Sequence, residues 1–167
     1  SDSYRILDYK SAQYLSFEKS VKSRQSYPTS RMGAMALLRQ TYLDADWYAS
    51  GNMKNKDASL EALNNNKKLT QIFESGNHLD VLRADKVGDE FGIQYTIVGG
   101  GDEFERIEDI KKTNARFIIP INFRKAYDLS NPLVSKNIAL SDLRKWNQEP
   151  SNLSVLDKNG IEFALTT

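Results

Sequence analysis

The chain has 167 residues, of which 40% are hydrophobic and 27% are charged, and its 23 basic and 22 acidic residues leave a net charge of +1. This length and composition are typical of one globular domain with a hydrophobic core. The near-neutral charge balance gives no overall field that favours nucleic acid or an anionic membrane, so we expect neither as a partner. No apolar run approaches the ~20 residues needed to cross a bilayer.

Metal-binding side chains are scarce. The chain has no Cys, which excludes disulfides, thiolate metal sites and a Cys nucleophile, and its one His is His78. A catalytic zinc site usually takes two or three His ligands. We therefore predict no metal ion and no cofactor for this chain by itself.

Residues 1–68 are predicted to be mainly helical. Residues 11–26 form at best a weak helix, because the segment is polar with scattered aromatic residues. Apolar residues then recur at spacings of three and four over 31–50, after an N-cap at Thr29 or Ser30. Gly51 ends this helix.

A second helix is predicted over residues 54–69. Asp57 or Ser59 caps it, Leu60 and Leu63 face inward, and the run Asn64–Asn66 breaks it.

Residues 69–167 are predicted to be repeated βα units. Strands begin near residues 70, 93, 116 and 161, and the segments between them have helical patterns that end at Gly92 and Gly160 or begin at caps such as Ser141. Apolar strands without polar alternation, separated by helices, are typical of parallel sheets with right-handed crossovers. Pro120 fits the carboxyl end of its strand rather than the middle.

Ligands of parallel sheets bind at the carboxyl ends of the strands. Here those ends are 74–78, 99–102, 122–125 and 166–167. The chain stops as its last strand reaches this edge, so we expect a single α/β domain that is a fragment of a larger protein. An open sheet has two unpaired edges, which predicts association with the remaining segments or with a second copy.

The loop Gly99-Gly100-Gly101-Asp102 has two interpretations. Glycine N–H groups at a helix amino end can hold a phosphate, which would make this a nucleotide site. The spacing matches neither common phosphate-binding motif, and Asp102, Glu103 and Glu105 would repel an anion. The alternative is a tight strand-to-helix turn with ordinary acidic caps.

Glu74 and His78 lie one helical turn apart after a strand. They could be a general base with its orienting acid, or two metal ligands. The alternative is a Glu at a strand end beside a solvated His. Asp102 is the third catalytic candidate.

Four segments resemble a known family. They are YPTSRMGAMALLRQTYLDADWY (27–48), QIFESGNHLDVLRADKVGDEFGIQYTIVGGGDEFERI (71–107), FIIPINFRKAYD (117–128) and NGIEFALTT (159–167). They look like the imidazolonepropionase-related branch of the amidohydrolase superfamily, in particular its large bacterial, periplasmic or secreted members. The resemblance implies a partial TIM-type (β/α)8 barrel of about four strands, preceded by helices, in a family that hydrolyses C–N bonds of amides or rings.

The resemblance also implies a zinc or other divalent metal centre in active members. The His ligands at the ends of the fifth and sixth barrel strands match Glu74 and Gly99, and the catalytic Asp of the eighth strand falls at or just beyond Thr166. Gly99, Gly100, Gly101, Asn122 and Thr166 would then be in loops that face the substrate.

Two functions follow as hypotheses. The parent protein is a metal-dependent amidohydrolase to which this segment contributes loops facing a small-molecule substrate. Alternatively, the segment is a non-catalytic barrel domain for binding or scaffolding.

Overall fold

The computed structural model of the chain describes residues 9–51 and 55–167. The strands are β1 (Ala12–Ser16), β2 (Thr70–Glu74), β3 (Thr96–Val98), β4 (Arg116–Pro120) and β5 (Phe163–Thr166). The helices are α1 (Arg31–Ala49), α2 (Ala58–Asn66), α3 (His78–Glu90), α4 (Ile107–Lys112), α5 (Pro132–Asn137), α6 (Leu140–Gln148) and α7 (Asn152–Lys158). Two short 3-10 helices, η2 (Glu103–Arg106) and η3 (Glu149–Ser151), precede α4 and α7. Within these ranges, none of the helices combines the length and the apolar character that crossing a membrane requires.

The fold is α/β, with a five-stranded sheet of βα units in the order β1-β2-β3-β4-β5. Strands β1 and β2 pair in parallel, as do β4 and β5. The order of the strands follows the chain without reversal, as in a barrel and unlike the doubly wound sheets. The predicted α/β class is confirmed, with five strands rather than about four.

The prediction of a weak helix over residues 11–26 is wrong. Residues Ala12–Ser16 form β1, in which Ala12 lies opposite Thr70 and Ser16 opposite Glu74. The local sequence gives little preference for either state, so the pairing with β2 decides the structure. The sheet therefore begins before the helices that were expected to precede it.

The chain divides into two compact units. The first unit comprises Ser1–Glu74 with Arg83–Thr96, and the second comprises Ser75–Leu82 with Ile97–Thr167.

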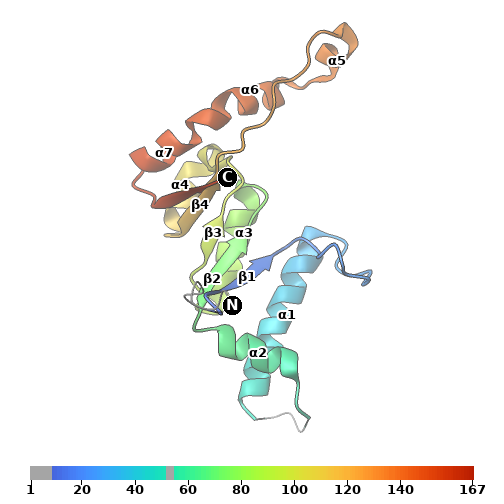
Figure 1. Cartoon of the computed structure of the whole chain (residues 1–167), viewed down its shortest axis with the longest axis vertical. Helices are drawn as coiled ribbons and strands as arrows, with labels where there is room; N and C mark the ends of the chain where they lie inside the picture. Colours follow the sequence, from blue (N-terminus) through green and yellow to red (C-terminus); the bar gives the residue numbers. More distant parts are fainter. Residues whose placement is uncertain (1–8, 52–54) are drawn as a thin grey trace, which may run out of the picture. The chain divides into compact units, whose positions relative to one another are not determined.

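The core of the first unit is aromatic. The ring of Phe73 lies 4.7 Å from that of Phe17 and 5.2 Å from that of Tyr95. The hydroxyl groups of Tyr42 and Tyr95 are 2.8 Å apart in a buried hydrogen bond. Helices α1 and α2 lie side by side (Figure 1).

Both predicted helix starts in this unit are confirmed. The side chain of Ser30 accepts a hydrogen bond from the Gly33 N–H, and that of Asp57 accepts from two N–H groups of α2. The helix α2 ends at Asn66, the last residue of the run Asn64–Asn66 that was expected to break it, so all three Asn residues are still helical. The Asn64 amide donates to the Ala45 carbonyl, which offsets its weak helix propensity.

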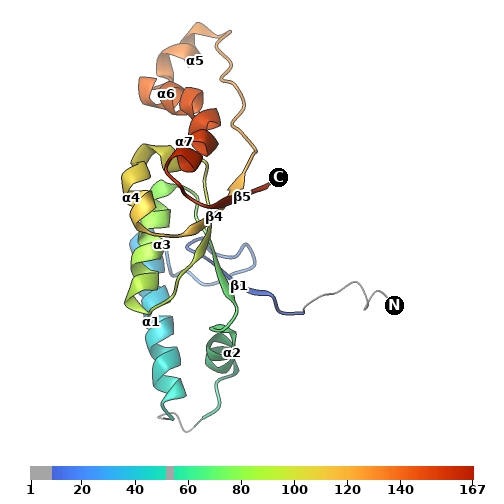
Figure 2. The same cartoon turned by 90° about the vertical axis from the view of Figure 1, so that its left-hand side faces the viewer.

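The second unit contains β4 and β5, which lie side by side (Figure 2). Phe117 lies opposite Phe163 and Pro120 opposite Thr166. Pro120 is the last residue of its strand, as predicted. Buried apolar residues of this unit form its core: Val81, Ile97, Ile110, Phe117, Ile119 and Leu156.

Two details of this unit differ from the prediction. The N-cap of α6 is Ala139 rather than Ser141, which lies inside the first turn. The segment between β4 and α6, for which no helix was predicted, contains α5, which Asn131 caps by accepting a hydrogen bond from the Leu133 N–H.

The charge of Asp85 in α3 gives a pH-dependent prediction. Burial, with the neighbouring charge of Asp89, raises the pKa of Asp85 from 3.8 to about 6. Because the folded-state pKa is raised, the stabilising contribution is present below the unfolded value near 3.8 and is lost as pH rises through about 6.

We therefore expect Asp85→Asn to raise the free energy of unfolding at neutral pH by about 1 kcal/mol, after allowance for solvent screening, with little effect at about pH 4. Urea unfolding at both pH values measures this, with the exposed Asp157→Asn as the control. An equal gain at both pH values would contradict the prediction.

Candidate functional site

The loop after β3 is held against the start of α3 within the second unit. A Cβ added at Gly100 would lie 2.7 Å from the Gly76 carbonyl oxygen and 3.0 Å from the Asn77 Cα. Gly101 has φ +85°, in the left-handed region that favours glycine. The two glycines are thus required by close backbone approach and by a turn.

The carboxylate of Glu103 accepts hydrogen bonds from the N–H groups of this loop. Its Oε1 accepts hydrogen bonds from the Gly100 N–H at 2.8 Å and the Gly101 N–H at 3.3 Å. Its Oε2 accepts from the Asn152 amide at 2.6 Å, and Glu103 is fully buried. The donors that could have held a phosphate therefore bind the chain's own carboxylate.

Burial raises the pKa of the Glu103 carboxyl, and the charge of Asp102 adds to this. The hydrogen bonds from Asn152 and Gly100 act in the opposite direction but do not outweigh burial. Asn152 is itself fixed, since its Oδ1 accepts from the Phe104 N–H at 2.9 Å. Glu103 is therefore a structural hydrogen-bond acceptor that holds the loop.

Asp102 joins the loop to two other elements, α3 through His78 and α6 through Lys145. Its Oδ1 accepts a hydrogen bond at 2.7 Å from the His78 N–H, so it caps α3 rather than the helix that follows it in sequence. Its Oδ2 lies 3.0 Å from His78 Nδ1 and 2.7 Å from Lys145 Nζ. Glu105 completes the group, 3.2 Å from Lys145 Nζ and 3.6 Å from His78 Nδ1.

This group, the His78–Asp102–Glu105–Lys145 cluster, is nearly closed to solvent around Asp102. The side chains of Asp102 and His78 are only 4% and 12% exposed. Burial alone would raise the pKa of Asp102, but hydrogen bonds and charges from Lys145 and His78 hold it below its usual value. Burial alone would lower the pKa of Lys145, but hydrogen bonds to Asp102 and Glu105 and their negative charges raise it above its usual value.

His78, Asp102 and Glu105 are also the one group in residues 9–51 and 55–167 with ligand atoms close enough to share a metal ion. Their ligand atoms lie within 4.8 Å of one another. The ammonium of Lys145, however, already contacts both carboxylates. A metal ion would have to displace this cation, so the donor set does not fit a resident metal.

The resemblance places metal-binding His ligands at Gly99 and Glu74, and the surroundings of Gly99 leave no room for a side chain. At Gly99, any side chain would meet the carboxylate of Glu103 and the Ile119 side chain, which lies 2.7 Å from a Cβ built there. Glu74 ends β2 in the first unit, where its charge and a hydrogen bond help raise the pKa of Tyr14. A histidine at position 99 would need Glu103 to move.

The structure therefore brings together two of the three catalytic candidates, His78 and Asp102. His78 is not a solvated side chain, and the carboxylate beside its ring is that of Asp102. Asn122 and Thr166 are exposed at the carboxyl ends of β4 and β5.

Sequence reasoning missed Lys145 and Asn152. Both lie more than forty residues beyond Asp102 and Glu103 in sequence, and both are in helices whose patterns look ordinary. Only the fold brings them to the loop.

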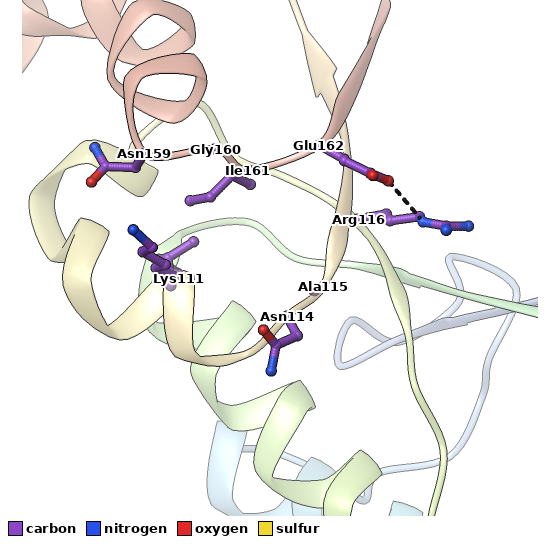
Figure 3. Close-up of a pocket in the computed structure, with 9 residues that line it drawn as sticks. Lys111, Asn114, Ala115, Arg116, Asn159, Gly160, Ile161 and Glu162 are labelled. Carbon is purple, nitrogen blue, oxygen red and sulfur yellow. Dashed lines mark ion pairs between the residues drawn. The ribbon is translucent and has the colours of Figure 1, made fainter.

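Another polar cavity of the second unit lies away from the cluster. It has a volume of about 330 Å³ and is bordered by Arg116 and Glu162, which form an ion pair of 3.0 Å (Figure 3). These residues are at the amino ends of β4 and β5. Since parallel sheets bind ligands at the opposite edge, we assign no function to this cavity.

Comparisons of the chain with family models, with curated proteins and with solved structures find no match.

Proposed function

We propose that this chain is a segment of an amidohydrolase-like barrel whose mouth binds small molecules and holds no catalytic metal ion of its own. The sequence likeness over four segments supports the family, and a parallel sheet whose strands follow chain order is compatible with a barrel. The hydrolase activity of the family would then belong to other parts of the parent protein.

One observation supports the proposal that the mouth of the barrel holds no metal ion. The ammonium of Lys145 lies 2.7 Å from Asp102 and 3.2 Å from Glu105, at the place where a metal ion would need to bind these carboxylates. A lysine charge and a divalent cation repel each other at such short range. Lys145 therefore serves as the cation of the cluster.

The nucleotide-binding alternative has less support. The N–H groups of Gly100 and Gly101 are engaged by Glu103, and the neighbouring Asp102 and Glu105 would repel phosphate.

Metal analysis tests the proposal. After exposure to zinc and desalting, we expect the purified chain to retain well under one equivalent of zinc, manganese or iron. The Lys145→Ala variant removes the competing cation, so we expect it to bind about one zinc ion in a calorimetric titration, with ligands in the number that a protein zinc site needs.

The double variant Lys145→Ala/His78→Ala is the control and should lose this binding. Circular dichroism verifies that both variants fold. Stoichiometric metal in the unaltered chain that is lost on His78→Ala would overturn the metal-free mouth. Failure of Lys145→Ala to take up zinc would overturn the role of Lys145 as the stand-in cation.

A further inference from the structure

A smaller cavity of about 180 Å³ lies beyond the carboxyl end of β4 in the second unit. It is lined by Phe123, Arg124, Trp146, Asn147, Glu149 and Pro150. The Trp146 indole N–H donates to the Arg124 carbonyl at 3.2 Å, which fixes the ring. The cavity therefore combines aromatic surface with one acid and one base, at the edge where parallel sheets bind ligands.

Glu149 is the unusual member of this lining. Its side chain is only 9% exposed, and its Oε2 is buried without a hydrogen-bond partner among the residues that the structure describes. The other oxygen, Oε1, lies 3.7 Å from Arg124 Nε, which is too long for a hydrogen bond. The Glu149 side chain therefore has no close hydrogen-bond donor among the residues that the structure describes, so a ligand N–H that reaches this carboxylate from the cavity would be stabilising.

Arg124 supplies the positive charge of the cavity, opposite the carboxylate of Glu149. Its side chain is 49% exposed, and Glu149 is its one ion-pair partner in the described part of the chain. A guanidinium group has five N–H donors in a planar fork that matches a carboxylate. The fork is thus available to an anionic group that enters from solvent.

We propose that this cavity binds a small zwitterion, a free amino acid or a molecule of the same charge pattern with an apolar side chain. The ammonium group donates to Glu149, the carboxylate pairs with Arg124, and the apolar part packs on Phe123 and Trp146. A zwitterion leaves the net charge of the Arg–Glu pair unchanged, whereas a simple amine or a simple acid adds an uncompensated charge. This deepens the binding role proposed above and rests on it.

L-phenylalanine is the probe, and Trp146 is the reporter. The chain has two Trp residues, so Trp47→Phe leaves Trp146 as the sole source of tryptophan fluorescence. We expect a saturable change on titration with L-phenylalanine, and at least about tenfold weaker binding of phenethylamine and of 3-phenylpropanoate, each of which lacks one charge. A chelator in the buffer keeps this result independent of the metal experiment.

Variants locate the site. Glu149→Gln and Arg124→Gln should each weaken the binding of L-phenylalanine about tenfold. The matched controls Glu162→Gln and Arg116→Gln, from the ion pair at the other cavity, should leave it unchanged.

The proposal is overturned by the absence of a saturable signal, by equal binding of the three probes, or by equal losses in the control variants. If the Glu149 variant does not fold, the comparison of the three probes on the Trp47→Phe chain still decides. Metal in the unaltered chain together with zwitterion binding would overturn the metal-free mouth and leave this site standing.

Discussion

Replacing Glu103 by Ala is expected to lower the free energy of unfolding by about 4 kcal/mol, because three buried or half-buried donors lose their acceptor. These are the N–H groups of Gly100 and Gly101 and the side-chain amide of Asn152. Urea unfolding followed by circular dichroism measures the loss, which corresponds to a fall in Tm of roughly 8–16 °C for a chain of this size.

Glu108→Ala is the control, since Glu108 is an exposed acid in the first turn of α4. It should change stability by no more than about 0.5 kcal/mol. Glu103→Gln should give an intermediate loss, because an amide retains one acceptor for the glycine N–H groups but turns a second donor toward Asn152. Equal losses in the Glu103 and Glu108 variants would contradict the structural role of Glu103.

Gly100→Ala is expected to destabilise the chain by about 3 kcal/mol, as overpacking against backbone does. The new Cβ would lie 2.7 Å from the Gly76 oxygen and 2.9 Å from the Gly76 carbonyl carbon, neither of which can rotate away. The loop and the start of α3 must then separate, which also weakens the bond from the His78 N–H to Asp102.

Gly76→Ala is the matched control at the same contact. A Cβ at Gly76 meets nothing within 4 Å. This variant should therefore be neutral or gain up to about 1 kcal/mol through the unfolded chain. Thermal unfolding compares the two variants, and the amide NMR signal of His78 reports the capping bond. A similar Tm for Gly100→Ala and Gly76→Ala would show that the close approach is absent.

The elements with strong local signals could be predicted from the sequence. The helix over Arg31–Ala49 has apolar spacing, a Ser cap and a Gly stop, and each signal depends on neighbouring residues alone. The strands β2 to β5 are apolar runs bounded by turn residues, so they were predicted too. β1 was not, because its five residues become a strand only through pairing with β2.

The candidate site was predicted only in part, because its residues meet through contacts between distant parts of the chain. The glycine loop, Asp102 and His78 stand out because a strand end, glycines and a lone His are visible in the sequence. Their connection depends on contacts over 24 residues between His78 and Asp102 and over 43 residues between Asp102 and Lys145. Nothing in the spacing of these residues distinguishes such pairs from other charged residues on helix surfaces.

The carboxylate of Glu103 has a consequence for competition at the glycine loop. Since Glu103 is two residues from Gly101 in the chain, its effective concentration at these N–H groups far exceeds that of any dissolved anion. A free phosphate could bind the N–H groups of the loop only by displacing the buried carboxylate of Glu103, which belongs to the same chain. Ligands of this protein are therefore expected to be recognised by side chains around the loop instead of by its backbone.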